Sequence, residues 1–194
     1  MAKYSKTFAH IGRAKRTAYR ARKAQQAQTS NKVKKMSEFV PRFTVVHSFD
    51  VAADLINKPH EDYPLRVPKT LEILNRLSSC FQSFSTMRFI NLWAITSFDV
   101  RSIHSEIMWD LPSRGSWRTV IVTVGGNAVL PPIFINEAME KILPLTSNCD
   151  LIEWYRQFEE IHPFEDGNGR VGGIVVAFLS WVKSEGKEIW APCQ

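Results

Sequence analysis

The stretch 170–184, RVGGIVVAFLSWVKS, constrains the fold of this chain more than any other part of it. From Ile174 to Val182 it is apolar almost all round, whereas a helix on a protein surface has a single apolar face. We therefore expect a central helix that is buried on every side. Gly186 stands where the C-terminal cap of such a helix belongs. The rest of the chain must supply amphipathic segments that cover this helix.

Helical periodicity is present in most of the preceding chain. A helix over 68–84 begins with Pro68 at a first-turn position, and its apolar residues fall on one face: Leu71, Leu74, Leu77, Phe81 and Phe84. The stretches 86–98 and 99–111 have similar spacing. Asp99 is the expected N-cap of the second of these, whose apolar stripe comprises Val100, Ile103, Ile107 and Leu111.

Two further helices are expected in the segment of sequence that precedes the central helix. Asn136 can cap a short helix that runs to Leu143. Asp150 opens a helix through Ile161 that Pro163 ends, because proline disfavours helical geometry at the residue before it. The buried face of this second helix comprises Leu151, Tyr155 and Phe158.

One stretch breaks the helical period. Residues 116–129, SWRTVIVTVGGNAV, are rich in β-branched side chains and contain the tight-turn signal Gly125-Gly126-Asn127. They predict a β-hairpin, and no other strand is predicted with comparable support. The expected fold class is therefore all-α: a helical bundle with one β-hairpin, preceded by a basic N-terminal arm.

The arm comprises residues 1–36, which hold eleven of the 25 Lys and Arg residues and no Asp or Glu. Residues 37–194 hold the other 14 basic residues against 19 acidic ones and form the expected single domain. The arm has hardly any large apolar residue, so we expect it to be disordered or transiently helical. Contact with nucleic acid or another anionic partner, an organellar transit peptide and a solvated extension are alternative roles for it.

Cysteine content and hydropathy bear on the compartment. Cys80, Cys149 and Cys193 are odd in number and show no CxxC spacing, which argues against a disulfide framework or a zinc site. No apolar run reaches the roughly 18 residues that a membrane span needs, so no membrane partner is expected. We expect a reducing, cytoplasmic location, with organellar targeting by the arm as an open alternative.

Residues 161–173, IHPFEDGNGRVGG, join two expected helices and carry the candidate chemistry. Gly167 and Gly169 permit positive φ, so that backbone N–H groups and the following helix N-terminus can form an anion site. Arg170 lies in the first helical turn, where the helix dipole disfavours a cation. Gly172 and Gly173 follow at a helix-propensity cost of roughly 1 kcal/mol each. A bound di- or triphosphate would account for the misplaced cation, with Arg170 as its clamp.

Three other side chains of this stretch have expected roles. Asp166 is a candidate Mg²⁺ ligand, because Mg²⁺ commonly takes one or two carboxylates together with phosphate oxygens and waters. His162, expected in an extended conformation before proline, can take a proton from a hydroxyl. Phe164 is the expected core anchor, and Glu165 is expected to be solvated. A structural alternative, a glycine-rich turn with a capping Asp, leaves the Arg and the paired glycines unexplained.

The string over 167–172 also matches GxGxxG, the dinucleotide fingerprint. That fingerprint requires a preceding strand inside a βαβ unit. A helix precedes it here, so we reject a dinucleotide-binding fold.

Residues 162–173 resemble the signature loop of the Fic family (Fic/Doc superfamily), H-P-F-x-D/E-G-N-G-R-x-x-R, at every position except the last. A wider resemblance covers about residues 68–185. It implies Mg²⁺-dependent transfer of AMP from ATP to a Ser, Thr or Tyr hydroxyl of a target protein. It makes His162 the general base, Asp166 the Mg²⁺ ligand and Arg170 a catalytic clamp on the leaving phosphates. The implied nucleotide-binding residues are Phe164, Gly167, Asn168, Gly169 and Arg170.

The resemblance also implies that the hairpin is a flap that holds the target by strand addition. Its docking residues would be Arg118, Thr119, Val120, Ile121 and Val122.

The departure at the end of the motif leaves alternatives open. Gly173 replaces the closing Arg, and the chain has no S/T-x-x-x-E-G/N inhibitory string, so the resemblance suggests an enzyme that is not inhibited in cis. An inhibitor protein acting in trans remains an alternative partner. A Doc-like protein kinase, a transferase using another nucleotide-linked donor and a non-catalytic nucleic-acid-associated protein are the alternative functions. An Arg restored at 173 is expected to tighten ATP binding.

Overall fold

The computed structural model describes residues 41–86, 95–143 and 150–193. The predicted arm over 1–36 and most of the helix expected over 86–98 lie outside these residues. No helix among the described residues is long and apolar enough to cross a membrane.

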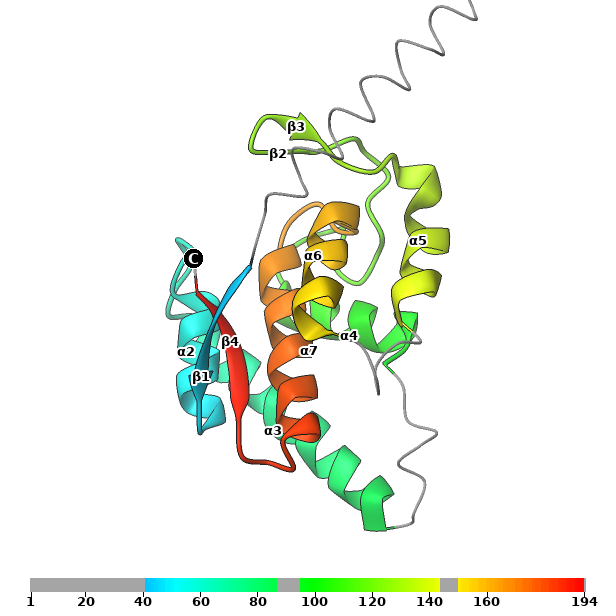
Figure 1. Cartoon of the computed structure of the whole chain (residues 1–194). Coiled ribbons are helices and arrows are strands. Elements are labelled where there is room, and N and C mark those ends of the chain that lie inside the picture. The colour runs from blue at the N-terminus through cyan, green and yellow to red at the C-terminus, as the bar shows by residue number, and fades with distance from the viewer. Residues whose placement is uncertain (1–40, 87–94, 144–149, 194) are drawn as a thin grey trace, which may run out of the picture. The chain divides into compact units, whose positions relative to one another are not determined.

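The helix α7, Asn168–Lys183, is the centre of the fold, as its apolar sequence predicts. Its residues from Arg170 to Ser180 are all buried. Helices α2, α3, α4 and α6 and strand β4 all pack against it. In Figure 1 it is the orange helix in the middle of the molecule. The continuous apolar run is thus buried by neighbouring elements on every side, as a helix that is apolar all round requires.

The surrounding helices each bury one face, in agreement with their amphipathic sequences. Their bounds are α2 Phe49–Asn57, α3 Val67–Thr86, α4 Ser97–Ile107, the short 3₁₀ helix η2 Pro132–Phe134, α5 Ile135–Ile142 and α6 Leu151–Ile161. On α6, the predicted residues Leu151, Tyr155 and Phe158 are buried. The mostly helical fold class is confirmed. Helix α2 was not predicted from the sequence.

Side chains cap the starts of α6 and α4, and two of the predicted caps need correction. Asp150 caps α6 as predicted, and its Oδ1 accepts from the backbone N–H groups of Ile152 and Glu153. For α4 the N-cap is Thr96 rather than Asp99, which forms the other half of a capping box. Asn136 does not cap α5 but lies inside it, where its side chain donates to Glu140. Two polar residues three apart can each fill the cap position, and local spacing alone does not decide between them.

A two-stranded antiparallel sheet that the sequence did not predict joins the ends of the described domain. Strand β1, Arg42–Val46, pairs with β4, Ile189–Cys193, with Arg42 opposite Cys193. The two labelled strands lie beside α2 in Figure 1. Strand β4 also packs on α2 and α7. The pairing is far apart in sequence, and Pro192 in β4 weakens the strand signal.

The predicted hairpin is present but shorter than its sequence suggested. Strand β2, Thr123–Val124, pairs with β3, Asn127–Ala128. Gly125 and Gly126 adopt φ of 55° and 77°, the positive values that a two-residue hairpin turn needs. Residues 117–122 are outside any strand, so most of the β-branched run forms an irregular connection instead.

Candidate functional site

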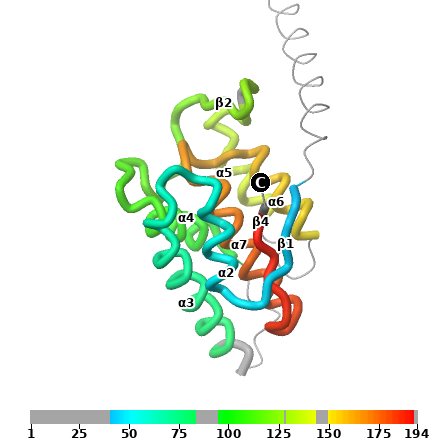
Figure 2. The backbone as a smooth tube through the Cα atoms, turned by 90° about the vertical axis from the view of Figure 1, so that its left-hand side faces the viewer, coloured from blue at the N-terminus to red at the C-terminus, as the bar shows by residue number. Residues whose placement is uncertain are grey.

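The signature loop joins the C-terminal end of α6 to the N-terminal end of α7, the orange segment in Figure 2. His162 ends α6 in a left-handed conformation (φ 49°, ψ 64°), so the predicted extended conformation is wrong. Its backbone N–H keeps the last helical hydrogen bond, 2.9 Å to the carbonyl oxygen of Phe158. The left-handed conformation of His162 ends the helix, so Pro163 can follow directly although His162 is not extended.

Only one of the two loop glycines has positive φ. Gly167 is the N-cap of α7 at φ 77°, while Gly169 is already helical, which corrects the prediction for Gly169. No side chain caps this helix start. The first amides of α7 therefore have neither a helical carbonyl nor a capping side chain as acceptor. Uncapped helix N-termini of this kind commonly bind anions in proteins.

Asn168 and Phe164 hold the loop together and are not open to a ligand. The Asn168 side chain is buried and pairs with the backbone of Phe164 twice: Oδ1 accepts from its N–H and Nδ2 donates to its carbonyl, each at 2.9 Å. The Phe164 ring is fully buried, which confirms it as an anchor. Neither side chain can contact a nucleotide directly in this conformation, so their predicted nucleotide-binding roles reduce to shaping the loop.

His104, on α4, packs against the signature loop. Its ring stacks on Phe164 with 3.8 Å between centroids and 1° between planes. Nδ1 accepts the backbone N–H of Gly115 at 2.8 Å, so the proton of the neutral ring is on Nε2, 3.2 Å from the carbonyl oxygen of Asp166. Burial lowers the pKa of His104 to about 4. A neutral histidine of fixed tautomer therefore connects α4 to the residue that precedes the α7 cap.

Arg118 is a buried anchor rather than a docking residue, which corrects its predicted role. Its side chain is 2% exposed, and its guanidinium donates to the carbonyl oxygens of Val120, Leu130, Ile161 and His162. Its backbone N–H also bonds the Pro163 carbonyl at 2.9 Å. A cation at the carbonyl end of α6 is favoured by the helix dipole. Arg118 thus fixes the backbone of the candidate base to the start of the hairpin segment.

The remaining predicted docking residues are accessible. Ile121 is 73% exposed and Val120 49%, and Thr119 is also exposed, while Val122 is half-buried. They lie in the irregular segment before β2. An extended, apolar and exposed segment remains compatible with the predicted docking of a target.

His162 faces a carboxyl group on its own helix. Its Nδ1 is 3.6 Å from Glu159 Oε2, and its side chain is 17% exposed. Both this Nδ1 and Glu159 Oε1 are buried without a hydrogen-bond partner among the described residues. The partly exposed ring is compatible with its predicted role as general base.

Arg170 is already paired with a carboxylate that the sequence analysis missed. Its side chain is 5% exposed, and its Nη2 is 3.0 Å from Oδ1 of Asp62, in the turn between α2 and α3. Burial lowers the Arg170 pKa and the Asp62 charge opposes that shift. Arg66 binds the other Asp62 oxygen, and Asp110 accepts both 2.9 Å bonds from Arg66 Nη2. Two cations and two carboxylates therefore balance at this position.

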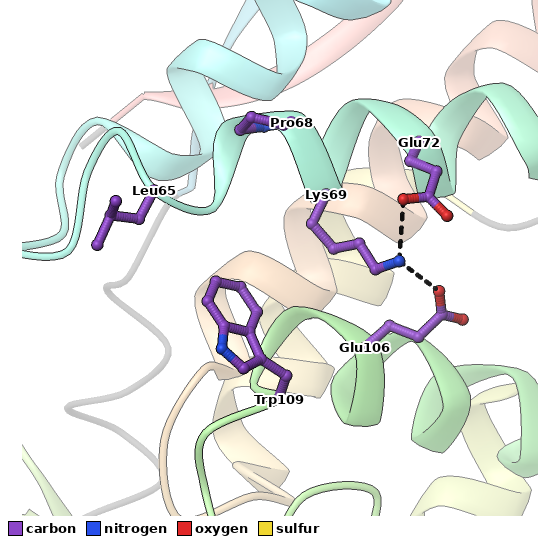
Figure 3. Close-up of a pocket in the computed structure, with 6 residues that line it drawn as sticks. All are labelled: Leu65, Pro68, Lys69, Glu72, Glu106 and Trp109. Atoms are coloured by element: carbon purple, nitrogen blue, oxygen red, sulfur yellow. Dashed lines mark hydrogen bonds and ion pairs between the residues drawn. The ribbon is translucent and has the colours of Figure 1, made fainter.

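The same network borders a surface groove of about 300 Å³, shown in Figure 3. Its lining residues are Leu65, Pro68, Lys69, Glu72, Glu106 and Trp109. Arg66 stacks over the Trp109 ring at 4.5 Å. Lys69 is held between Glu72 at 2.9 Å and Glu106 at 3.7 Å, so its charge is already matched by carboxylates.

Asp166 fits the predicted Mg²⁺ ligand in its exposure and hydrogen bonding. The residue is exposed, and one carboxylate oxygen accepts the Gly167 N–H at 2.6 Å, which leaves the second oxygen for a cation. No group of three or more His, Cys, Asp or Glu among the described residues could hold a metal by itself. Mg²⁺ does not require such a group when phosphate oxygens and waters complete its shell. His60 lies in the same charged region, where burial and the Arg170 charge lower its pKa.

The paired glycines of α7 have a packing explanation rather than a functional one. A Cβ on Gly172 would come within 2.9 Å of the Tyr155 ring on α6. A Cβ on Gly173 would be 3.0 Å from Pro192 on β4 and 3.2 Å from Ile56 on α2. The glycines let three neighbouring elements, α6, α2 and β4, approach the central helix closely. The expectation that an Arg at 173 would extend over a phosphate is therefore wrong, because that position faces the packed core.

The signature loop lies within a region that matches a known protein family. Residues 94–180 match the model of the family described as Fic/DOC family. A comparison with curated proteins gives no match.

Solved structures of Fic proteins are similar at low identity. One is a Fic domain containing signalling protein from Bacteroides thetaiotaomicron, with a TM-score of 0.45 and 17% identity, covering 62% of this chain and 50% of that one. A second is a Fic family protein from Desulfovibrio desulfuricans, with a TM-score of 0.43 and 19% identity, covering 68% of this chain and 42% of that one. A third is Fic-1, residues 134–508, from C. elegans, with a TM-score of 0.43 and 16% identity, covering 94% of this chain and 64% of that one. The chain spans less than two thirds of each of these structures.

Proposed function

The chain belongs to the Fic/DOC family, and we propose that it is a Fic-type transferase that moves AMP from ATP to a Ser, Thr or Tyr hydroxyl of a target protein. The observation that carries the proposal is the uncapped start of α7, with His162, Asp166 and Arg170 around it. These residues supply a base, a cation ligand and a phosphate partner within one loop. Family membership supports the transferase class, and the AMP chemistry is our inference.

Phosphate binding would use the backbone more than the side chains. The free amides at the start of α7 would donate to phosphate oxygens, and Arg170 would bind the leaving phosphates after exchanging Asp62 for them. Asp166 would hold Mg²⁺ through its free oxygen, and the ion would offset phosphate charge. The buried anchors, Phe164 and Asn168, would keep the amides in place during this exchange.

The transfer step needs one base. His162 would take the proton from the target hydroxyl, whose oxygen forms a bond to the α-phosphorus of ATP. The bond between the α-phosphorus and the bridging oxygen to the β-phosphate then breaks, and pyrophosphate leaves. The target segment would lie along residues 119–122, of which the first three are exposed, and Arg118 ties this segment to the carbonyl of His162.

A second candidate donor is favoured by the charge balance around Arg170. Its cation is neutralised by Asp62, and Gly173 contributes no further cation. A donor with fewer negative charges than ATP, such as a nucleotide-linked alcohol, would require less compensating charge. A Doc-like kinase reaction would transfer the γ-phosphate instead. A role for the arm in nucleic-acid binding concerns residues outside the described ones.

Labelled donors separate these functions. The full-length protein is incubated with a lysate and either α- or γ-labelled ATP in the presence of Mg²⁺, and modified proteins are identified by mass spectrometry. AMP transfer labels target bands from the α-phosphate only. The variant His162→Ala should lower the rate about 10²–10⁴-fold. His47→Ala is the matched control, since His47 is exposed and its Nδ1 hydrogen-bonds the Lys187 carbonyl, away from the loop. His162-dependent label from the γ-phosphate, or no His162-dependent label with either donor, would exclude AMP transfer from ATP.

A further inference from the structure

Helix α6 carries a carboxyl group beside the candidate base, and one of its oxygens has no hydrogen-bond partner among the described residues. Glu159 and His162 are three residues apart, a spacing that brings side chains together on a helix. Glu159 Oε2 lies 3.6 Å from His162 Nδ1, which is too long for a hydrogen bond. Glu159 Oε1 and His162 Nδ1 are both buried, and neither has a partner among the described residues. Buried polar atoms without partners are uncommon and call for an explanation.

The surroundings of this pair leave Glu159 facing the imidazole. Tyr155, one turn earlier, hydrogen-bonds the Glu159 side chain, and its pKa is raised by burial, by the Glu159 charge and by this bond. Arg118 is the only cation that contacts His162 among the described residues, and it binds the backbone carbonyl at 2.7 Å rather than the ring. The adjacent Glu160 differs, since it forms an ion pair with Arg156. The two neighbouring glutamates therefore have different environments, and only Glu159 lies beside the base.

We propose that Glu159 is a positioning residue for His162: its carboxylate accepts the Nδ1–H and leaves Nε2 as the nitrogen that takes the proton. This inference rests on the proposed function for the base role, but not for the geometry of the pair. The tautomer of a histidine is set by the bond that its other nitrogen makes. The 3.6 Å separation is short enough to close with a small shift of either side chain.

The pair would act mainly in the transition state. While His162 is neutral, Glu159 faces an uncharged ring. When Nε2 takes the hydroxyl proton, the imidazole becomes a cation with a poorly solvated carboxylate directly behind Nδ1. An interaction that strengthens only as the reaction proceeds raises kcat without improving substrate binding.

The tautomer can be measured without any activity. Nitrogen-15 NMR of the histidine-labelled full chain should show wild-type His162 with its proton on Nδ1. Glu159→Ala should move the proton to Nε2, the usual site in a free imidazole. A proton already on Nε2 in the wild type, or a tautomer unchanged in Glu159→Ala, would overturn the proposal. This result stands even if the wild type transfers no AMP, in which case the proposed function fails by itself.

Kinetics and stability separate positioning from a structural role. Glu159→Gln should lower kcat about tenfold or more with the KM for ATP changed by less than about twofold. Its unfolding midpoint should stay close to that of the wild type, because Gln has nearly the same size and its amide oxygen can still accept from Tyr155. Glu160→Gln, the matched control on the next residue, should retain kcat. A Glu159→Gln variant that loses stability while keeping kcat shows a structural role and refutes the proposal.

Discussion

Neutralising Asp62 is expected to strengthen anion binding at the start of α7. The ion pair between Asp62 and Arg170 must open before a phosphate can use this cation. A charge-assisted hydrogen bond from Arg170 to a phosphate contributes roughly 1.5–3 kcal/mol, and because the competing Asp62 is 29% exposed we take the lower end of that range. Because about 1.4 kcal/mol corresponds to a decade in affinity, Asp62→Asn should bind tripolyphosphate or ATP about tenfold more tightly.

Asp62 remains ionised over the working range of such an assay. Burial acts to raise its pKa, but the hydrogen bond from Arg66 and the charge of Arg170 outweigh burial and lower the pKa below 3.8. For a carboxyl group with a depressed folded pKa, the stabilisation is present above the unfolded value and is lost as pH falls through the folded one. Competition between Asp62 and a phosphate should therefore persist at neutral pH and weaken only below about pH 4.

The assay is calorimetric titration of the full-length protein with tripolyphosphate and with Mg²⁺-ATP. Asp54→Asn is the control, because Asp54 lies on α2 and accepts from the Tyr63 hydroxyl at 2.6 Å, whereas Arg170 pairs with Asp62. A second readout is the melting temperature. Because Asp62→Asn leaves a buried cation unpaired, its melting temperature should be lower than that of the wild type. Added phosphate should raise the melting temperature of the variant more than that of the wild type. Equal or weaker anion binding by Asp62→Asn would refute the reasoning.

Four further outcomes are expected. Gly173→Arg should destabilise the fold by about 1–3 kcal/mol in urea titration without tightening ATP binding, because the side chain would enter the contacts with α2 and β4; tighter binding would contradict this. Arg118→Met should cost about 3 kcal/mol or more, since several carbonyl oxygens lose their donor, and wild-type stability would show that water replaces it. The pKa of His104 is about 4 when folded and 6.5 when not, so stability should fall by up to about 3 kcal/mol from pH 6.5 to pH 4, and His104→Phe should flatten that slope. Deleting residues 1–36 should leave the domain folded. If the full-length protein binds nucleic acid through these residues, its retention on DNA or RNA should fall steeply as the salt concentration rises.

The elements that could be predicted from the sequence are those defined by local pattern. The apolar run of α7 predicts its central position, and Asp150 marks the start of α6 by a contact within three residues. The glycine pair at 125–126 predicts the hairpin turn. The β1–β4 sheet could not be predicted in the same way, because each strand is five residues long and finds its partner at the other end of the domain.

For the site, the motif predicts which residues are close but not how they are held. His162 takes a left-handed conformation because ending the helix there outweighs the usual preference before proline. Asp62, His104 and Arg118 reach the loop from three separate segments, and nothing in their local sequence indicates that contact. Glu159 is different, since its spacing from His162 on one helix could have indicated the contact.

The pairing of β1 with β4 also determines how the domain responds to mechanical load. The strands are antiparallel, and Arg42 at the start of one lies opposite Cys193 at the end of the other. A force that pulls these two ends apart acts across the strands, so the hydrogen bonds carry it one pair at a time rather than all together. The sheet should therefore unzip from Arg42 towards Val46 under a small force. Once β4 peels away, α7 loses the contacts around Gly173, and tension applied at the ends reaches the helix that begins at the signature loop.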